Sequence, residues 1–172
     1  MGMTALWRTA RLTTLLVLAA TPGLMRSPLL ASGQAASLTD ARKLLEGLWS
    51  LESFEVRTPG KPPIVLKGQG LLTYDNFGNL HMEVRADPAA AELLRAAGIV
   101  IDKGVISTDG KAILDVPNHT LTYFLEGQPK SGGGPLAANR KRYYELKGDT
   151  LTLTTRDDKG APMSIAVWRR AH

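Results

Sequence analysis

Two stretches of the sequence, GLWSLESFEVR at positions 47–57 and MSIAVWRR at positions 163–170, decide the fold. The first places aromatic and apolar residues at alternate positions, which indicates a half-buried β-strand. The second is an apolar run that ends at Trp168, so that an aromatic residue, Trp49 or Trp168, stands at each end of an all-β pattern. Closure of a sheet into a barrel pairs its first strand with its last and removes both exposed edges. The two stretches therefore predict a closed antiparallel barrel.

The segments between them predict about eight strands in all. In the first stretch the apolar phase shifts from Trp49 and Leu51 to Phe54 and Val56, which predicts a bulge or a sharp bend. Gly, Pro, Asn and Asp mark turns between the later strands, including Asp109-Gly110 and Pro117-Asn118. Ile64–Leu66 and Gly70–Tyr74 are predicted to form one extended run, and the other predicted strands are Leu80–Arg85, Ile99–Ser107, Lys111–Val116, Thr120–Glu126, Arg140–Leu146 and Thr150–Thr155.

Two helices are expected beside the strands. A short one begins near Ser37–Asp40, and a second runs from Asp87 to Gly98, with Asp87 as its N-cap and the glycine as its stop. The apolar face of the second helix is predicted to hold Leu93, Leu94 and Ala97. The predicted fold class is mainly β: one antiparallel up-and-down barrel with an inserted helix, a short N-terminal helix and a Gly-rich mobile loop at 128–139.

The first 33 residues have the layout of a secretory signal peptide. Two arginines, Arg8 and Arg11, precede an apolar core at Leu12–Ala20, and small residues follow at Ala31–Gly33. The apolar core is roughly ten residues long, against the roughly 20 that span a bilayer. We therefore expect residues 1–33 to be a signal peptide, residues 34–172 to be one barrel domain, and the protein to be exported to the periplasm or the medium, without a stable membrane span.

Charge and cysteine content exclude several classes of function. The net charge of the full chain is +5, and removal of the three arginines before Gly33 leaves 18 basic and 16 acidic residues, a net charge of +2. That balance does not favour nucleic-acid binding. The chain has no cysteine, which excludes disulfides, thiol nucleophiles and cysteine-ligated metals.

Several segments resemble the bacterial and fungal lipocalin-like domain family, a branch of the calycin barrels. Residues 47–54 resemble the opening Gly-x-Trp-x-Leu-x-Ser-aromatic of that family, and residues 70–74 followed by Gly78 resemble its second and third strands. Residues 142–146, 148–153 and 167–170 resemble its closing meander. The resemblance runs from about Leu44 to Arg170 and implies a β-barrel more strongly than an activity; the barrel interior suggests a small hydrophobic or amphiphilic ligand.

Alternation in the meander predicts which side chains meet such a ligand. Arg142 and Tyr144 share a face with Leu146, so they are expected to point inward if Leu151 and Leu153 do. In that position Arg142, with Tyr144 and Tyr74, would hold the acid head of an amphiphile; the alternative is an Arg142 at the rim or paired with Glu52. The predicted ligand-binding residues are Arg142, Tyr144, Tyr74, Leu72 and Met82, and those predicted to close the barrel are Trp49, Trp168, Arg169 and Arg170, with Trp49 stacked on either arginine.

No pattern for catalysis or for a metal emerges. The three histidines, His81, His119 and His172, include no close pair, and no Gly-x-Ser-x-Gly surrounds Ser53 or Ser164, the two hydroxyls expected to point inward. We expect no metal, no cofactor and no catalytic residue. The leading hypothesis is an exported ligand-binding barrel; the alternatives are a barrel-based isomerase or cyclase using Tyr74, Tyr144 or Arg142, and an envelope interaction protein with a filled barrel.

Overall fold

The computed structural model describes residues 37–126, 137 and 140–172. The signal peptide predicted at 1–33, and all of the predicted Gly-rich loop except Ala137, lie outside these residues. The described helices and strands are α1 (Leu38–Leu45), β1 (Gly47–Val56), β2 (Ile64–Lys67), β3 (Gly70–Tyr74), β4 (Asn79–Arg85), α2 (Pro88–Ala96), β5 (Val105–Asp115), β6 (Thr120–Leu125), β7 (Lys141–Lys147), β8 (Thr150–Arg156) and β9 (Pro162–Arg170).

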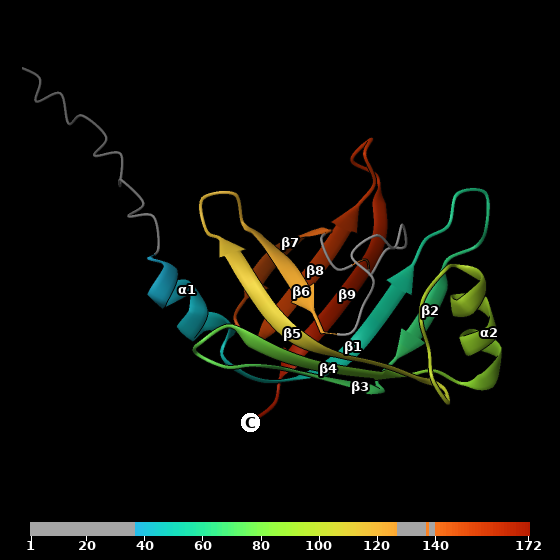
Figure 1. Ribbon diagram of the computed structural model, residues 1–172, viewed down its shortest axis with the longest axis horizontal. Coiled ribbons are helices and arrows are strands. Elements are labelled where there is room, and N and C mark those ends of the chain that lie inside the picture. The colour runs from blue at the N-terminus through green and yellow to red at the C-terminus, as the bar shows by residue number, and fades with distance from the viewer. Residues whose placement is uncertain (1–36, 127–136, 138–139) are drawn as a thin grey trace, which may run out of the picture. The chain divides into compact units, whose positions relative to one another are not determined.

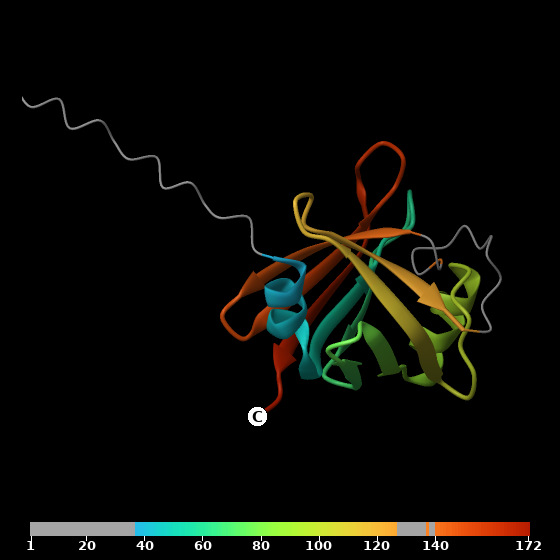
Figure 2. The same cartoon turned by 60° about the vertical axis from the view of Figure 1, so that its left-hand side comes forward.

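The strands form one antiparallel sheet that closes on itself. The order is β2-β1-β3-β4-β5-β6-β7-β8-β9, and β1 also pairs with β9 (Figures 1 and 2). Both β2 and β3 pair with β1, at residues 53–56 and 47–50 respectively. They therefore act as one barrel strand, interrupted where Gly68 takes a positive φ and donates to the Glu52 carbonyl. The predicted up-and-down antiparallel barrel of about eight strands is confirmed.

The bulge predicted in the first strand is present in β1. The register between β1 and β9 shifts between Leu51 and Ser53, so Trp49 and Leu51 before the shift and Phe54 and Val56 after it all point into the core. One extra residue lets β1 bend while both halves of the strand keep their apolar side chains inside.

The predicted division of residues 99–116 into two strands is wrong. Residues 99–104 form only one isolated bridge, Asp102 to Val105, and β5 then runs without interruption through Asp109 and Gly110. Gly110 does not form a turn but allows β5 and β6 to pack closely. A Cβ at this position would lie 2.1 Å from the Phe124 carbonyl oxygen of β6. The Gly in the middle of a strand thus marks a close approach of two backbones.

The two helices lie at opposite sides of the barrel (Figures 1 and 2). Helix α2 packs near β2, and Asp87 caps it by accepting a hydrogen bond from the Ala90 amide at 2.8 Å, as predicted. Its buried residues are Ala90, Ala91 and Leu94. Of the predicted apolar face, Leu94 is buried, whereas Leu93 is 56% exposed.

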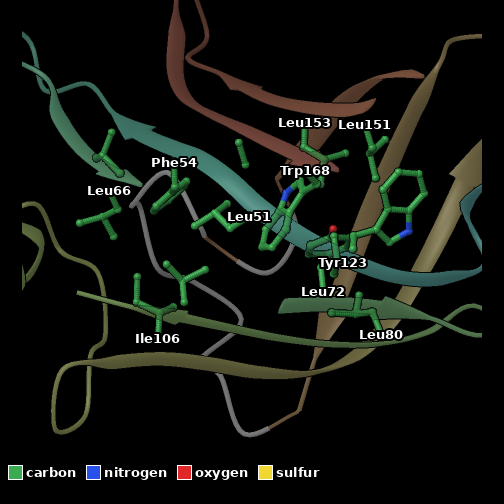
Figure 3. Packing of buried hydrophobic residues seen from close by; sticks show 14 of the residues in the cluster. Leu51, Phe54, Leu66, Leu72, Leu80, Ile106, Tyr123, Leu151, Leu153 and Trp168 are labelled. Carbon is green, nitrogen blue, oxygen red and sulfur yellow. The ribbon is translucent and has the colours of Figure 1, made fainter. Parts of the chain in front are cut away.

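The apolar core lies inside the barrel and receives side chains from every strand of the sheet. Side chains from β1, β8 and β9 point towards those of β3 to β6 (Figure 3). The largest members, Trp49 and Trp168, are fully buried. No helix among the described residues is long and apolar enough to cross a membrane.

Candidate functional site

Five polar side chains form a buried band inside the barrel, and we call this set the polar band. Each is at most 5% exposed, although all belong to a mainly apolar interior. They come from five strands, β3, β6, β7, β8 and β9, and are Tyr74, Tyr123, Arg142, Thr155 and Ser164.

Arg142 is the only charged member of the polar band. The alternation of β7 places it inward, as predicted, and its side chain is 3% exposed. Its guanidinium carbon lies 3.9 Å from the centroid of the Tyr123 ring, a cation–π contact, and its Nη1 donates to the Arg140 carbonyl at 2.8 Å. The alternative pairing with Glu52 is wrong, because the Glu52 carboxylate accepts from Arg169 Nε at 2.5 Å on the outer surface.

Tyr123 joins Arg142 to the third member of the polar band, Tyr74. The two phenol hydroxyls share a hydrogen bond across the barrel, with ring centroids 6.4 Å apart. The sequence analysis did not single out Tyr123. The signal was there: Leu121, Tyr123 and Leu125 alternate on β6, so an inward Leu121 requires an inward Tyr123.

Burial governs the proton affinities in this cluster. Removal from water raises the pKa of Tyr74 well above its ordinary value, with Tyr123 adding to the rise and Arg142 opposing it. Burial also raises the pKa of Tyr123, again opposed by Arg142, and lowers the pKa of Arg142. An arginine still keeps its charge at neutral pH. The cluster thus presents one cation and two neutral phenols to the interior.

Two hydroxyl groups extend the polar band along the neighbouring strands. Thr155 lies directly opposite Arg142 in the register of β7 and β8, and Ser164 lies directly opposite Thr155 in that of β8 and β9. The Thr155 and Ser164 hydroxyl oxygens are 2.7 Å apart. Ser164 is therefore inward, as expected. Ser53 is not, since it is only half-buried and pairs with Lys67 and Val167 outside the inward rows.

The other predicted ligand-binding residues lie apart from the polar band. Tyr144 is inward on β7 but half-buried, and its ring packs against His119 at a centroid distance of 5.5 Å. Burial raises its pKa, and Asp115 adds to the rise. Leu72 is fully buried and lies opposite the partly buried Met82 in the register of β3 and β4. The structure thus brings Tyr74 and Arg142 together through Tyr123, and Tyr144 faces a different neighbour.

The residues predicted to close the barrel differ in position: Trp49 and Trp168 are buried in the core, and Arg169 is exposed on the outer surface. Arg170 stacks on the Trp49 ring, with its guanidinium carbon 4.2 Å from the centroid. Trp168 is buried in the core between β1 and β8, where it pairs with Leu51 in the register. Arg169 lies outside and bonds Glu52. Of the two arginines left open by the sequence, Arg170 is the one that contacts Trp49.

Clusters outside the polar band provide no comparable candidate site among the described residues. No group of three or more histidine and acidic side chains among the described residues could hold a metal ion. His81 bonds the Asp109 carboxylate at 2.7 Å on the outer surface. Near the end of α2, Leu94 and Ile99 are buried and Leu93 is exposed, so these three residues form no continuous apolar surface patch.

The chemistry available to the polar band is recognition of an oxygen anion. Arg142 supplies a positive charge, the two phenols can donate or accept hydrogen bonds, and the band contains neither an imidazole nor a carboxylate to act as a general base. The arrangement can bind and orient an acid group but has no side chain suited to proton abstraction at neutral pH.

Comparison with known proteins gives a likeness among solved structures but none among family models or curated sequences. No protein-family model and no curated protein sequence matches the chain. Among solved structures, the chain is similar to a lipocalin-like protein from Bacteroides uniformis, at 14% sequence identity and a TM-score of 0.41, over 74% of this chain and 99% of that one.

Proposed function

We propose that this protein binds a small amphiphilic molecule inside the barrel, with the acid head of the ligand at Arg142 and its apolar part against the core. The observation that carries this proposal is the burial of Arg142, which is 3% exposed, in the interior of a mainly apolar barrel. Binding without a chemical step is the function that this cluster supports best.

The position of Arg142 favours a functional role. Transfer of a charged group out of water is costly, and a buried charge offsets that cost only through close pairing and hydrogen bonds. A buried arginine is therefore a poor device for stabilising a barrel, for which an apolar side chain of similar size would serve as well. Its planar fork suits a carboxylate or phosphate oxygen, and ionisable groups held in such sites cluster at places of function.

The neighbours of Arg142 support an amphiphile rather than a simple anion. Thr155 lies opposite Arg142 in the register of β7 and β8, and the Tyr123 ring lies against the guanidinium. Beyond them the inward face becomes apolar, with Leu153 and Leu151 following Thr155 at alternate positions of β8. A ligand with one charged end and one apolar end matches this sequence of side chains.

Native mass spectrometry of the chain from residue 34 onward tests the proposal. We expect a stoichiometric excess of mass that is lost on denaturation, and a smaller excess in Arg142→Gln. Arg156→Gln is the matched control, because Arg156 makes the corresponding contact on the outside, 5.1 Å from the exposed Tyr143 ring. Equal ligand occupancy in Arg142→Gln and Arg156→Gln would show that Arg142 does not bind the ligand.

Export is part of the same proposal and is supported by the sequence of residues 1–33. A barrel outside the cytoplasm would carry or capture its ligand in the periplasm or the medium. Determination of the N-terminal sequence of the protein from each cell fraction tests this. A mature start near residue 34 in the exported fraction is expected, and an intact Met1 in the cytoplasm would contradict it.

A further inference from the structure

A second polar group faces the interior away from the polar band. The Trp168 side chain is 1% exposed, and among the residues that the structure describes its buried Nε1 has no hydrogen-bond partner. Buried donors in native proteins nearly always have a partner, so an orphaned indole N–H needs an explanation.

The other core tryptophan, Trp49, provides a comparison, because its indole N–H has a hydrogen-bond partner within the protein. Trp49 is as deeply buried as Trp168, and its Nε1 donates to the Leu45 carbonyl at 2.8 Å. That bond ties α1 to the start of β1. The barrel therefore satisfies one of its two buried indoles with its own backbone and leaves the other without an acceptor.

The place of Trp168 relates it to the polar band. It lies on β9, four residues after Ser164, and both side chains point inward. Four residues of strand span about 13 Å. Trp168 lies opposite Leu51 and Leu151 in the strand registers, and Figure 3 shows its ring among the buried side chains of the core. Trp168 and the polar band thus both belong to the inward face of the barrel.

We propose that the indole N–H of Trp168 donates a hydrogen bond to an uncharged oxygen of the ligand, such as a keto or ester carbonyl. This inference rests on the proposed function and narrows it: the ligand class is an oxygenated acid, with an anionic head at Arg142 and a neutral acceptor along its apolar part. A plain fatty acid would leave the Trp168 N–H unsatisfied and would bind more weakly.

Binding of dodecanoate and of a series of oxododecanoates, with the keto group at successive carbons, tests the inference by calorimetry. At least one oxododecanoate should bind about tenfold more tightly than dodecanoate, the gain expected from one hydrogen bond made to a buried donor. Trp168→Phe should abolish this advantage, so that the variant binds the preferred oxododecanoate no more tightly than dodecanoate.

Nuclear magnetic resonance gives a second readout that does not depend on a variant. The chain from residue 34 onward contains two tryptophans, Trp49 and Trp168, so its spectrum has two indole N–H signals. Addition of the preferred oxododecanoate should move the Trp168 signal to lower field. The Trp49 signal is the internal control, because its N–H is already bonded to Leu45.

The outcomes separate the inference from the proposed function. If dodecanoate and every oxododecanoate bind equally well, and the Trp168 signal does not move, the inference is wrong and the proposed function survives. If none of these acids binds, the proposed function fails and the inference fails with it. A keto preference that persists in Trp168→Phe would also overturn the inference.

Discussion

Arg170, at the end of the last strand, stacks on Trp49, near the start of the first, with 4.2 Å between the guanidinium carbon and the ring centroid. The same side chain donates to the carbonyls of Glu46 and Leu44, at 2.7 and 2.6 Å, at the end of α1. One arginine therefore joins the closing strand, the opening strand and the N-terminal helix. A cation at a helix C-terminus also interacts favourably with the unpaired carbonyls there.

Arg170→Gln should destabilise the barrel. We expect the free energy of unfolding to fall by about 1–2 kcal/mol, because the variant loses a cation–π contact and two charged hydrogen bonds. Urea denaturation measures the change. Arg169→Gln is the control: its exposed pair with Glu52 should be worth less than about 1 kcal/mol. Equal losses in the two variants would show that Arg170 has no special part in closure.

Gly110→Ala should destabilise the protein more strongly. The new Cβ would lie 2.1 Å from the Phe124 carbonyl oxygen, so β5 and β6 must separate. We expect a loss of at least about 2 kcal/mol in thermal or urea unfolding. At Gly148, which has a positive φ and no neighbour within 4 Å, asparagine should change stability by no more than about 0.5 kcal/mol. A tolerated Gly110→Ala would contradict the close approach.

The hydroxyl pair of Thr155 and Ser164 should behave as a coupled unit. Thr155→Val leaves the buried Ser164 hydroxyl without its partner, and Ser164→Ala does the same to Thr155. Each single change should cost about 1–3 kcal/mol. The double variant should cost less than the sum of the two by about 1 kcal/mol, because both partners are removed together. Strict additivity in urea denaturation would show that the pair contributes nothing.

Stability should fall at alkaline pH because of Tyr74 and Tyr123. The pKa of each phenol is higher in the folded chain than its ordinary value of 10.0, so folding favours the protonated forms. Their contribution is therefore complete below pH 10 and is lost as the pH rises from 10 towards the folded pKa values. The unfolding free energy, measured across this range, should fall more steeply in the parent than in the double variant Tyr74→Phe/Tyr123→Phe. Equal slopes would contradict the pKa directions.

Much of the barrel could be predicted because period-two alternation is a local property. The phase shift between Leu51 and Phe54 predicted the bulge in β1, and the inward position of Arg142 followed from Leu146 on the same strand. The order of the final three strands followed from their turns. These features depend on neighbours within a few residues, which the sequence displays directly.

The features that the sequence could not predict depend on residues far apart in the chain. The dipeptide Asp109-Gly110 is typical of a turn. Gly110 is instead required because the backbone of β6 lies too close for a side chain, and the sequence alone does not show that contact. The hydrogen bond between Tyr74 and Tyr123 joins residues 49 positions apart, and no local pattern reports such a contact. The choice of Arg170 over Arg169 as the partner of Trp49 depends on the register of β1 with β9, which the bulge alters. Contacts across the barrel are set by register, and register requires the structure.

The binding of dodecanoate and of dodecanol by the chain from residue 34 onward, with and without Arg142, tests the central claim most directly. The two probes share an apolar tail and differ in the charge of the head. We expect Arg142→Gln to weaken dodecanoate binding about 10- to 100-fold, the usual worth of a hydrogen bond to a charged group, and to leave dodecanol binding nearly unchanged. Arg156→Gln should alter neither affinity. Dodecanoate affinity that is the same in the parent and in Arg142→Gln, or no binding by the parent, would contradict the account.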